Sequence, residues 1–280
     1  MTILVIGAAG NIAGLVVPAL IDRGAAVKGF VPKPEQVPIA KQRGASDVAV
    51  GDLSDSASLD TALKGVEGVF HVGPVFAPTE VQMGKNMVDA ARRAGVRKFV
   101  FSSVIHPVLS SLPNHAAKAP VEEALINSGL EYTILHPTML FQNLAASWDR
   151  VIKTGVLAEP WSADTRFSRV DYRDVADVAA IAFTGDELAY GTFELCAPRI
   201  MNRHDVAALL SEVLHREIRV GTLDPSVLGD LPRDMKAMFE HYNHNGLLGS
   251  PLSLRTILGR EPRTLQAYFE ELAAGAGSSS

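Results

Sequence analysis

The first residues of the chain place glycine where a backbone can hold a phosphate group. Gly7, Gly10 and Ala13 follow a run of branched apolar residues with the spacing G-x-x-G-x-x-A. Gly7 suits a tight turn after a strand, and Gly10 lets the backbone approach a pyrophosphate. A helix that begins near Ile12 would direct its free N–H groups and its positive dipole end toward that group. The pattern predicts a dinucleotide-binding loop, and the alternative is a purely structural strand–helix turn.

The segment after the second apolar run bears on which dinucleotide would bind. Residues 26–31 are followed by Pro32 and Lys33, and no acidic residue comes before Glu35. An NAD site usually has Asp or Glu here, which accepts hydrogen bonds from the ribose 2′-OH. Lys33 instead supplies a cation where a 2′-phosphate would lie. The sequence therefore predicts that NADP(H) is preferred and NAD(H) possible, unless Lys33 is simply a solvated side chain.

Short apolar runs alternate with helical patterns over the first 140 residues and must position this loop. Most of the runs are apolar on successive residues, which is typical of strands buried on both faces of a parallel sheet. Strand and helix repeated in this way imply right-handed crossovers. We therefore expect an α/β Rossmann fold with a doubly wound, mostly parallel sheet. Its strands are expected at residues 3–7, 26–31, 47–50, 68–73, 97–103, 131–137 and 192–196.

The rhythm changes after about residue 140. Helical patterns at 170–183, 202–214, 234–243 and 263–272 no longer alternate regularly with strands. We expect residues 1–140 to form the dinucleotide-binding domain, with strand 192–196 joining its sheet. Residues 141–274 should build an interleaved, mainly helical substrate-side lobe. The small and polar residues 275–280 are expected to be a disordered tail.

Composition excludes several classes of partner. The chain has 280 residues and a formal net charge of −5, which argues against broad electrostatic binding of nucleic acid or acidic membranes. No stretch approaches the roughly 18 apolar residues of a membrane span. The single cysteine, Cys196, cannot form an internal disulfide, and no signal segment is recognised, so we expect a cytoplasmic protein. The eight histidines lack ligand spacing, so no metal is expected. The expected partner is a small-molecule substrate, and the chain is expected to be a monomer or a homodimer.

Seven segments together resemble the NmrA-like branch of the atypical short-chain dehydrogenase/reductase superfamily. They are residues 7–14, 50–55, 68–74, 98–104, 115–144, 169–180 and 246–271, and the stretch from His115 to Asn143 is the most specific. The resemblance implies a Rossmann domain, a small C-terminal lobe and a nicotinamide cofactor in the cleft between them. Some members of the family reduce quinones, dyes or natural-product intermediates. Others bind NADP without known turnover and act as redox-sensing regulators.

The resemblance carries roles onto matching positions of this chain. It implies that Gly7, Gly10, Asn11 and Ile12 form the pyrophosphate loop and that Asp52 and Leu53 border the adenine, although Asp52 could equally be a turn residue or a helix cap. Gly73 and Pro74 would border the cofactor, and Ser102 and Ser103 occupy the strand end where superfamily enzymes often carry a catalytic serine. Lys118 would hold the nicotinamide ribose. Pro137 and Thr138 would run past the nicotinamide toward Phe141 and Asn143 on the substrate side. Ala9, Val31, Lys33 and Val75 adjoin these positions and complete the expected cofactor site.

Two departures from the family pattern shape the expected chemistry. The Tyr-x-x-x-Lys motif of the superfamily would need tyrosine at Asn114, so the usual proton relay for ketone reduction is absent. Many relatives carry arginine where this chain has Pro32, so Lys33 must take its place.

Lys118 has a physical argument of its own. A lysine in the first turn of a helix opposes the macrodipole, at a cost of roughly 0.3–1 kcal/mol. Its position therefore suggests a ribose-binding or catalytic role, with a surface lysine as the alternative and Glu122 as its expected ion-pair partner. His106 is the second catalytic candidate, as a proton donor.

We therefore expect an NAD(P)H-dependent oxidoreductase that transfers hydride to a small electrophilic acceptor without the usual tyrosine. A quinone, an azo compound or an iminium-type compound fits this chemistry, in an apolar cleft lined by Pro74, Val75 and Phe141. The alternative is a non-catalytic NADP(H)-sensing regulatory protein. A third and less favoured alternative is an isomerase or dehydratase on the same scaffold.

Overall fold

The computed structural model describes residues 1–277 and divides into two compact units. The first unit consists of Met1–Val108, His115–His136 and Val175–Phe193, and the second contains Leu109–Asn114, Pro137–Asp174 and the residues from Glu194 onward. The division by sequence placed residues 175–191 in the C-terminal lobe, whereas here they cluster with the first unit. The reason is that the helix over these residues packs on the large sheet, where the ring of Phe183 covers Gly68.

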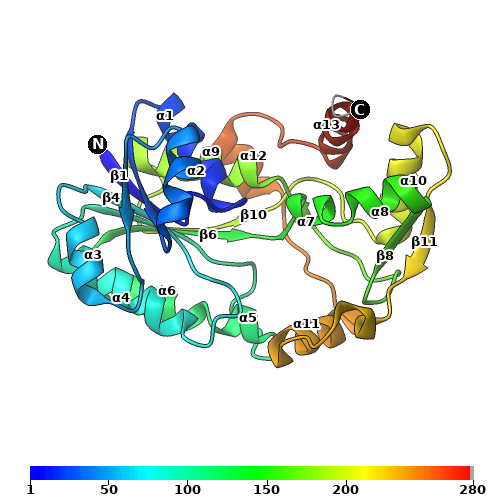
Figure 1. Ribbon diagram of the computed structural model, residues 1–280, viewed down its shortest axis with the longest axis horizontal. Coiled ribbons are helices and arrows are strands. Elements are labelled where there is room, and N and C mark those ends of the chain that lie inside the picture. The colour runs from blue at the N-terminus through cyan, green and yellow to red at the C-terminus, as the bar shows by residue number, and fades with distance from the viewer. Residues whose placement is uncertain (278–280) are drawn as a thin grey trace. The chain divides into compact units, whose positions relative to one another are not determined.

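A seven-stranded sheet forms the centre of the first unit (Figure 1). The spatial order of its strands is β10-β6-β5-β4-β1-β2-β3, so the order reverses between β1 and β4. The neighbouring strands from β6 to β3 pair in parallel. The strands are β1 (Thr2–Ile6), β2 (Ala26–Val31), β3 (Asp47–Val50), β4 (Gly68–Val72), β5 (Lys98–Ser102), β6 (Glu131–Pro137) and β10 (Gly191–Leu195). The predicted doubly wound Rossmann sheet is confirmed.

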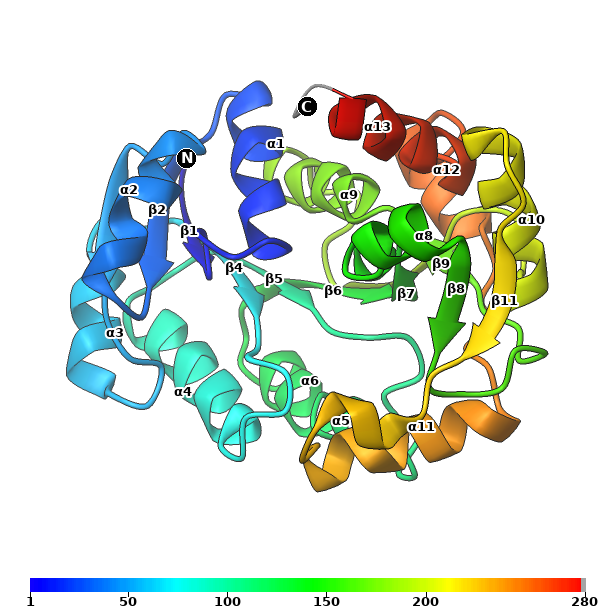
Figure 2. The ribbon, with the colours of Figure 1, turned by 45° about the vertical axis from the view of Figure 1, so that its right-hand side comes forward.

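Helices cover both faces of this sheet because its strands are apolar on both sides. Leu4, Val69 and Phe99 pack on one face against α3 (Ser56–Ala62), α4 (Glu80–Arg93) and α6 (Ala119–Ile126). The other face carries α1 (Val16–Asp22), α2 (Val37–Gln42) and α9 (Tyr172–Thr184), as Figure 2 shows. Every residue of β5 is buried, as expected for a central strand.

The second unit has a core of its own. Phe141, Leu144 and Trp148 pack there against residues of the helices α10 (Arg203–Leu214) and α13 (Leu265–Gly277). Two small parallel sheets, which the sequence did not predict, pair β8 (Val156–Glu159) with β11 (Arg219–Thr222) and β7 (Met139–Leu140) with β9 (Arg169–Val170). The two residues of β7 and the two of β9 are too few to show an alternating pattern. The remaining helices are α5 (Pro113–Ala116), α7 (Gln142–Ala145), α8 (Trp148–Thr154), α11 (Arg233–His244) and α12 (Leu252–Leu258).

The last helix, α13, extends into the predicted tail. Of the predicted tail, residues 275–277 belong to α13, and residues 278–280 lie outside the described part. Among residues 1–277, no helix combines the length and the apolar character that a membrane span requires.

Candidate functional site

The glycine loop after β1 turns sharply at the carboxyl edge of the sheet. Gly7 has a φ of +73°, a left-handed conformation that glycine adopts without strain. Its amide donates to the carbonyl oxygen of Phe30 at 2.9 Å, and its own carbonyl accepts from the Gly10 amide at 2.7 Å. A Cβ at Gly10 would lie only 3.1 Å from the Gly7 oxygen. The left-handed conformation therefore calls for glycine at position 7, and the close approach of the Gly7 oxygen favours glycine at position 10.

The loop leaves several backbone donors without an acceptor. Among the described residues, the amides of Ala9, Asn11 and Ile12 donate to no backbone carbonyl. Gly10 and Asn11 are exposed, and Ala9 and Ile12 are half-buried, so solvent or a ligand reaches this stretch. A single 3₁₀ turn, η1 (Ala13–Leu15), follows and leads into α1. Successive unpaired amides in a turn form a concavity that suits an anion.

The residues expected near an adenosine lie after β2 and β3. Val31 is buried at the end of β2, and Lys33 is exposed just before the short helix η2 (Pro34–Gln36). The Asp52 carboxylate accepts from the Ser54 amide at 2.7 Å, so it closes its own turn. Asp55, rather than Asp52, caps α3. Leu53 packs partly buried against the core below α3 and α4. The adenine role of Asp52 and Leu53 stays a prediction.

The register of the sheet brings three further strand ends together. Val72 of β4 lies opposite Ser102 of β5, and Ser102 lies opposite Leu135 of β6. The residues that follow each of these positions therefore share one edge. They are Gly73, Ser103 and His136, and all three are buried.

Lys118 is held by a partner that the sequence did not reveal. Its ammonium donates to Oε1 of Glu80, the first residue of α4, and the two side chains are only 2% and 5% exposed. A Cβ at Gly73 would lie 3.1 Å from Oε1 of Glu80 and 3.3 Å from Nζ of Lys118, so glycine leaves room for the pair. The structure corrects the expected pairing with Glu122. Lys118 is the N-cap of α6 and reaches α4, whereas Glu122 faces the strands.

Glu122 lies between two other side chains. The Ser103 hydroxyl donates to Oε1 of Glu122, and Nε2 of His136 lies 2.9 Å from the same oxygen. The side chains of Glu122 and His136 are 13% and 11% exposed. A hydroxyl, a carboxylate and an imidazole thus form one network at the carboxyl ends of β5 and β6. Such a network can hold and pass a proton.

His71 of β4 is a neutral neighbour of the Lys118 pair. Its ring packs against those of Phe99 and Phe101, with centroids 6.1 and 5.6 Å away. Burial, followed by the positive charge of Lys118, lowers the pKa of His71 to about 3. Its Nδ1 atom is buried and has no hydrogen-bond partner within the described chain. The imidazole is therefore uncharged near neutral pH.

Other expected site residues have varied surroundings. Pro74 and Val75 are exposed in the loop between β4 and α4, and Ser102 is buried at the end of β5. His106 is half-buried with a φ of +53°, which few residues other than glycine adopt. Its role as a proton donor stays a prediction.

In the second unit, Phe141 is 1% exposed and packs against Tyr268 in the core, while Asn143 is exposed on α7. Pro137 ends β6, and the amide of the buried Thr138 donates to the Leu195 carbonyl at 3.2 Å. Their roles near the nicotinamide and the substrate stay predictions.

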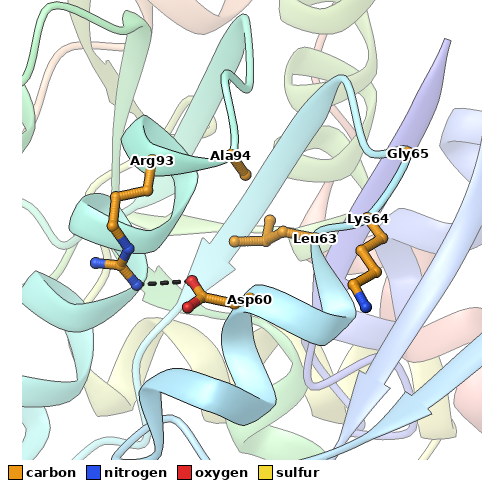
Figure 3. A pocket seen from close by; sticks show the side chains of 6 residues that line it. All are labelled: Asp60, Leu63, Lys64, Gly65, Arg93 and Ala94. Atoms are coloured by element: carbon orange, nitrogen blue, oxygen red, sulfur yellow. Dashed lines mark hydrogen bonds and ion pairs between the residues drawn. The ribbon is translucent and has the colours of Figure 1, made fainter.

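A surface pocket of about 400 Å³ lies elsewhere in the first unit (Figure 3). It is lined by Asp60, Leu63, Lys64, Gly65, Arg93 and Ala94. An ion pair of 2.7 Å joins Arg93 and Asp60 in it. These residues precede β4 and β5, so the pocket lies at the amino ends of the strands, the edge opposite to the glycine loop. Ligands of open parallel sheets bind at the carboxyl ends, and the pocket is therefore not a candidate for the dinucleotide. No cluster of three metal-ligating side chains occurs within residues 1–277.

Comparison with known proteins identifies the family. Residues 1–269 match the NmrA-like family. The chain belongs to this family. Over 99% of its length it is 28% identical to an NAD(P)H azoreductase from Xenophilus azovorans, of which 99% is covered.

Two solved structures share the fold of this NmrA-like protein. The triphenylmethane reductase of Citrobacter sp. complexed with NADP(H) superimposes with a TM-score of 0.85 at 20% identity, over 98% of this chain and 100% of the other. NmrA, a negative transcriptional regulator in complex with NADP, gives a TM-score of 0.77 at 19% identity, over 96% of this chain and 94% of the other. At these identities the likeness concerns the fold alone.

Proposed function

We propose that this NmrA-like protein is a reductase that binds NADP(H) and transfers hydride to a small electrophilic acceptor. One observation carries the proposal. The amides of Ala9, Asn11 and Ile12 lie unpaired in a solvent-reachable turn at the carboxyl edge, next to the point where the strand order reverses. This is where parallel α/β sheets bind dinucleotides. Similarity to an NAD(P)H azoreductase over nearly the whole of both chains supports the same cofactor.

The residues present fit a dinucleotide. The three amides bind the pyrophosphate, and Lys33 supplies the cation for a 2′-phosphate. Lys118 gives one hydrogen to Glu80 and has two left for the hydroxyls of a ribose. Because the Lys118 side chain is nearly closed to solvent, this contact requires a local rearrangement around the pair.

The nicotinamide, when bound, supplies the hydride. The chain contributes orientation and exclusion of water. Asn114 cannot act as a phenolic acid, so acceptors that are already electrophilic fit best: azo compounds, quinones or iminium-type compounds. Reduction of a quinone or an azo compound also consumes a proton, whereas hydride alone completes the reduction of an iminium-type compound. The network of Ser103, Glu122 and His136 is a local source of that proton, and solvent is the other source.

Oxidation of NADPH tests the proposal directly. The purified protein is mixed with NADPH and a panel of azo dyes, quinones and triphenylmethane dyes, and loss of the reduced-nicotinamide absorbance is followed. We expect steady, enzyme-dependent oxidation with at least one class of acceptor. Arg93→Met, in the pocket at the opposite edge, serves as a control that should retain full activity.

A non-catalytic sensor of NADP(H) is the second candidate function. Asn114 stands where the catalytic tyrosine would be, and the fold is also that of the regulator NmrA. Tight binding of NADPH without oxidation by any acceptor of the panel would favour the sensor. Failure to bind either phosphorylated or plain nicotinamide dinucleotide would overturn both candidates.

A further inference from the structure

The side chain of Arg43 reaches the glycine loop from the end of another helix. Arg43 is the C-cap of α2, and its Nη1 atom donates to the carbonyl oxygen of Ala8 at 3.0 Å and to that of Gly10. The arginine is 35 and 33 residues away from these partners in the sequence. No local pattern therefore shows the contact.

Gly14 explains how the guanidinium fits so close to the backbone. A Cβ at this position would overlap the Arg43 guanidinium and would lie 2.8 Å from the carbonyl oxygen of Ala8. Gly14 is buried and is the second residue of η1. The glycine therefore leaves the space through which Arg43 approaches the two carbonyls.

The two carbonyl contacts determine where two amides point. In a planar trans peptide, the C=O and the following N–H point in opposite directions. The Ala8 carbonyl shares a peptide with the Ala9 amide, and the Gly10 carbonyl shares one with the Asn11 amide. Arg43 holds both oxygens on its own side, and the Gly14 amide also donates to the Gly10 oxygen, at 3.0 Å. Both N–H groups therefore point to the other side, and at the Ala8 peptide Arg43 is the donor that holds the carbonyl. Neither of these two amides donates to a backbone carbonyl within the described chain.

We propose that Arg43 is a positioning residue for the pyrophosphate loop. It fixes two peptide groups before the ligand arrives and places a positive charge behind them, without touching the ligand. Charge-assisted hydrogen bonds of this kind also polarise the peptide groups that accept them. The inference rests on the proposed function, because the pyrophosphate of a dinucleotide is the anion involved. It concerns the part that NADPH and NADH share.

An arginine on the adenosine side of such a fold has an obvious rival role, as a ligand of the 2′-phosphate. The two roles differ in what they predict for NADH, which has no such phosphate. A loop brace affects both dinucleotides equally, whereas a 2′-phosphate ligand affects NADPH alone.

The experiment compares Arg43→Met and Arg43→Lys with the unaltered protein. Dissociation constants for NADPH and NADH are measured by fluorescence of the reduced nicotinamide. Arg43→Met is expected to raise both dissociation constants by a similar factor, about 10- to 100-fold, because charged hydrogen bonds to the loop are lost. Arg43→Lys keeps the charge and one donor and should recover part of the affinity. Arg23→Met, at the exposed C-cap of α1, changes the net charge equally and should bind both dinucleotides normally.

A second measurement reports the loop without any ligand. In ¹H–¹⁵N spectra of the full chain, Arg43→Met should shift the amide signals of Ala9 and Asn11, and Arg23→Met should leave them in place. If Arg43→Met binds NADPH more weakly but binds NADH with unchanged affinity, the proposal is overturned in favour of a 2′-phosphate contact. Unchanged affinities with unmoved amide signals would also overturn it. If Arg43→Met does not fold, Arg43→Lys carries the same comparisons.

The two proposals fail in different ways. An unaltered protein that binds neither dinucleotide overturns the proposed function and the ligand assigned to the loop. The amide signals would still decide whether Arg43 orients the loop.

Discussion

Removing one member of the buried pair between Lys118 and Glu80 is expected to destabilise the protein strongly. The side chains are 2% and 5% exposed, so the partner left behind would be a charge in a dry site. Breaking a buried pair in this way costs about 3–5 kcal/mol. The free energy of unfolding of a whole domain is only about 5–15 kcal/mol. Lys118→Met keeps most of the side-chain volume and leaves the Glu80 carboxylate alone.

A double substitution separates the charge from the packing. Lys118→Met combined with Glu80→Leu replaces both ions by apolar side chains of similar volume, which is often close to neutral. We therefore expect the double variant to be more stable than Lys118→Met alone. The exposed pair of Arg93 and Asp60, with side chains 46% and 52% exposed, is a matched control in the same unit. Arg93→Met should cost less than about 1 kcal/mol.

Urea unfolding followed by two spectroscopic probes measures these free energies and tests whether the transition is two-state. The reasoning would be refuted if Lys118→Met cost no more than Arg93→Met. It would also be refuted if the double variant lost the sum of the two single losses, because the two groups would then not interact. Reduced stability of Lys118→Met with normal affinity for NADPH would remove Lys118 from the proposed ribose contact and leave it a structural role.

Two further predictions concern a buried histidine and the choice of dinucleotide. Because the pKa of His71 is lowered from 6.5 to about 3, the unfolded chain binds its proton first as the pH falls. The contribution of the neutral His71 to the free energy of unfolding is present in full above about pH 6.5. It is lost as the pH falls toward 3, at up to about 1.4 kcal/mol per pH unit. His71→Leu should therefore flatten the dependence of urea unfolding on pH, and equal slopes would contradict the assignment. Lys33→Ala should raise the dissociation constant for NADPH by up to about fivefold and leave that for NADH unchanged, as expected for one exposed ionic contact. Equal effects on the two dinucleotides, in the same fluorescence titration, would exclude the 2′-phosphate role.

The central sheet could be predicted from the sequence because its signals are local. Each of its seven strands was expected within one residue of its observed bounds, including β10 far along the chain. Continuous apolar runs mark strands that are buried on both faces, and such runs need no knowledge of distant residues. The glycine loop was visible for the same reason, since Gly7 and Gly10 satisfy a turn within four residues.

The small sheets of the second unit and the affiliation of residues 175–191 with the first unit were not predicted. Strands as short as Met139–Leu140 carry no periodicity, and they form only because a partner strand lies beside them. The packing of α9 on the large sheet depends on tertiary contacts that a helical pattern does not encode. In both cases the deciding interactions lie between elements.

The partners of the candidate site residues show the same limit. Lys118 stood out in the sequence because a lysine is unfavourable at the start of a helix. Its partner Glu80 lies 38 residues away, and Arg43 lies more than 30 residues from the loop that it contacts. Spacing along the chain predicts neighbours on one helix, as in the expected pairing with Glu122, but not across elements. Sequence alone therefore determined the strands, the turn and the candidate lysine. Only the order and register of the folded strands decided which charged groups meet, because the carboxyl ends of parallel strands come together from distant parts of the chain.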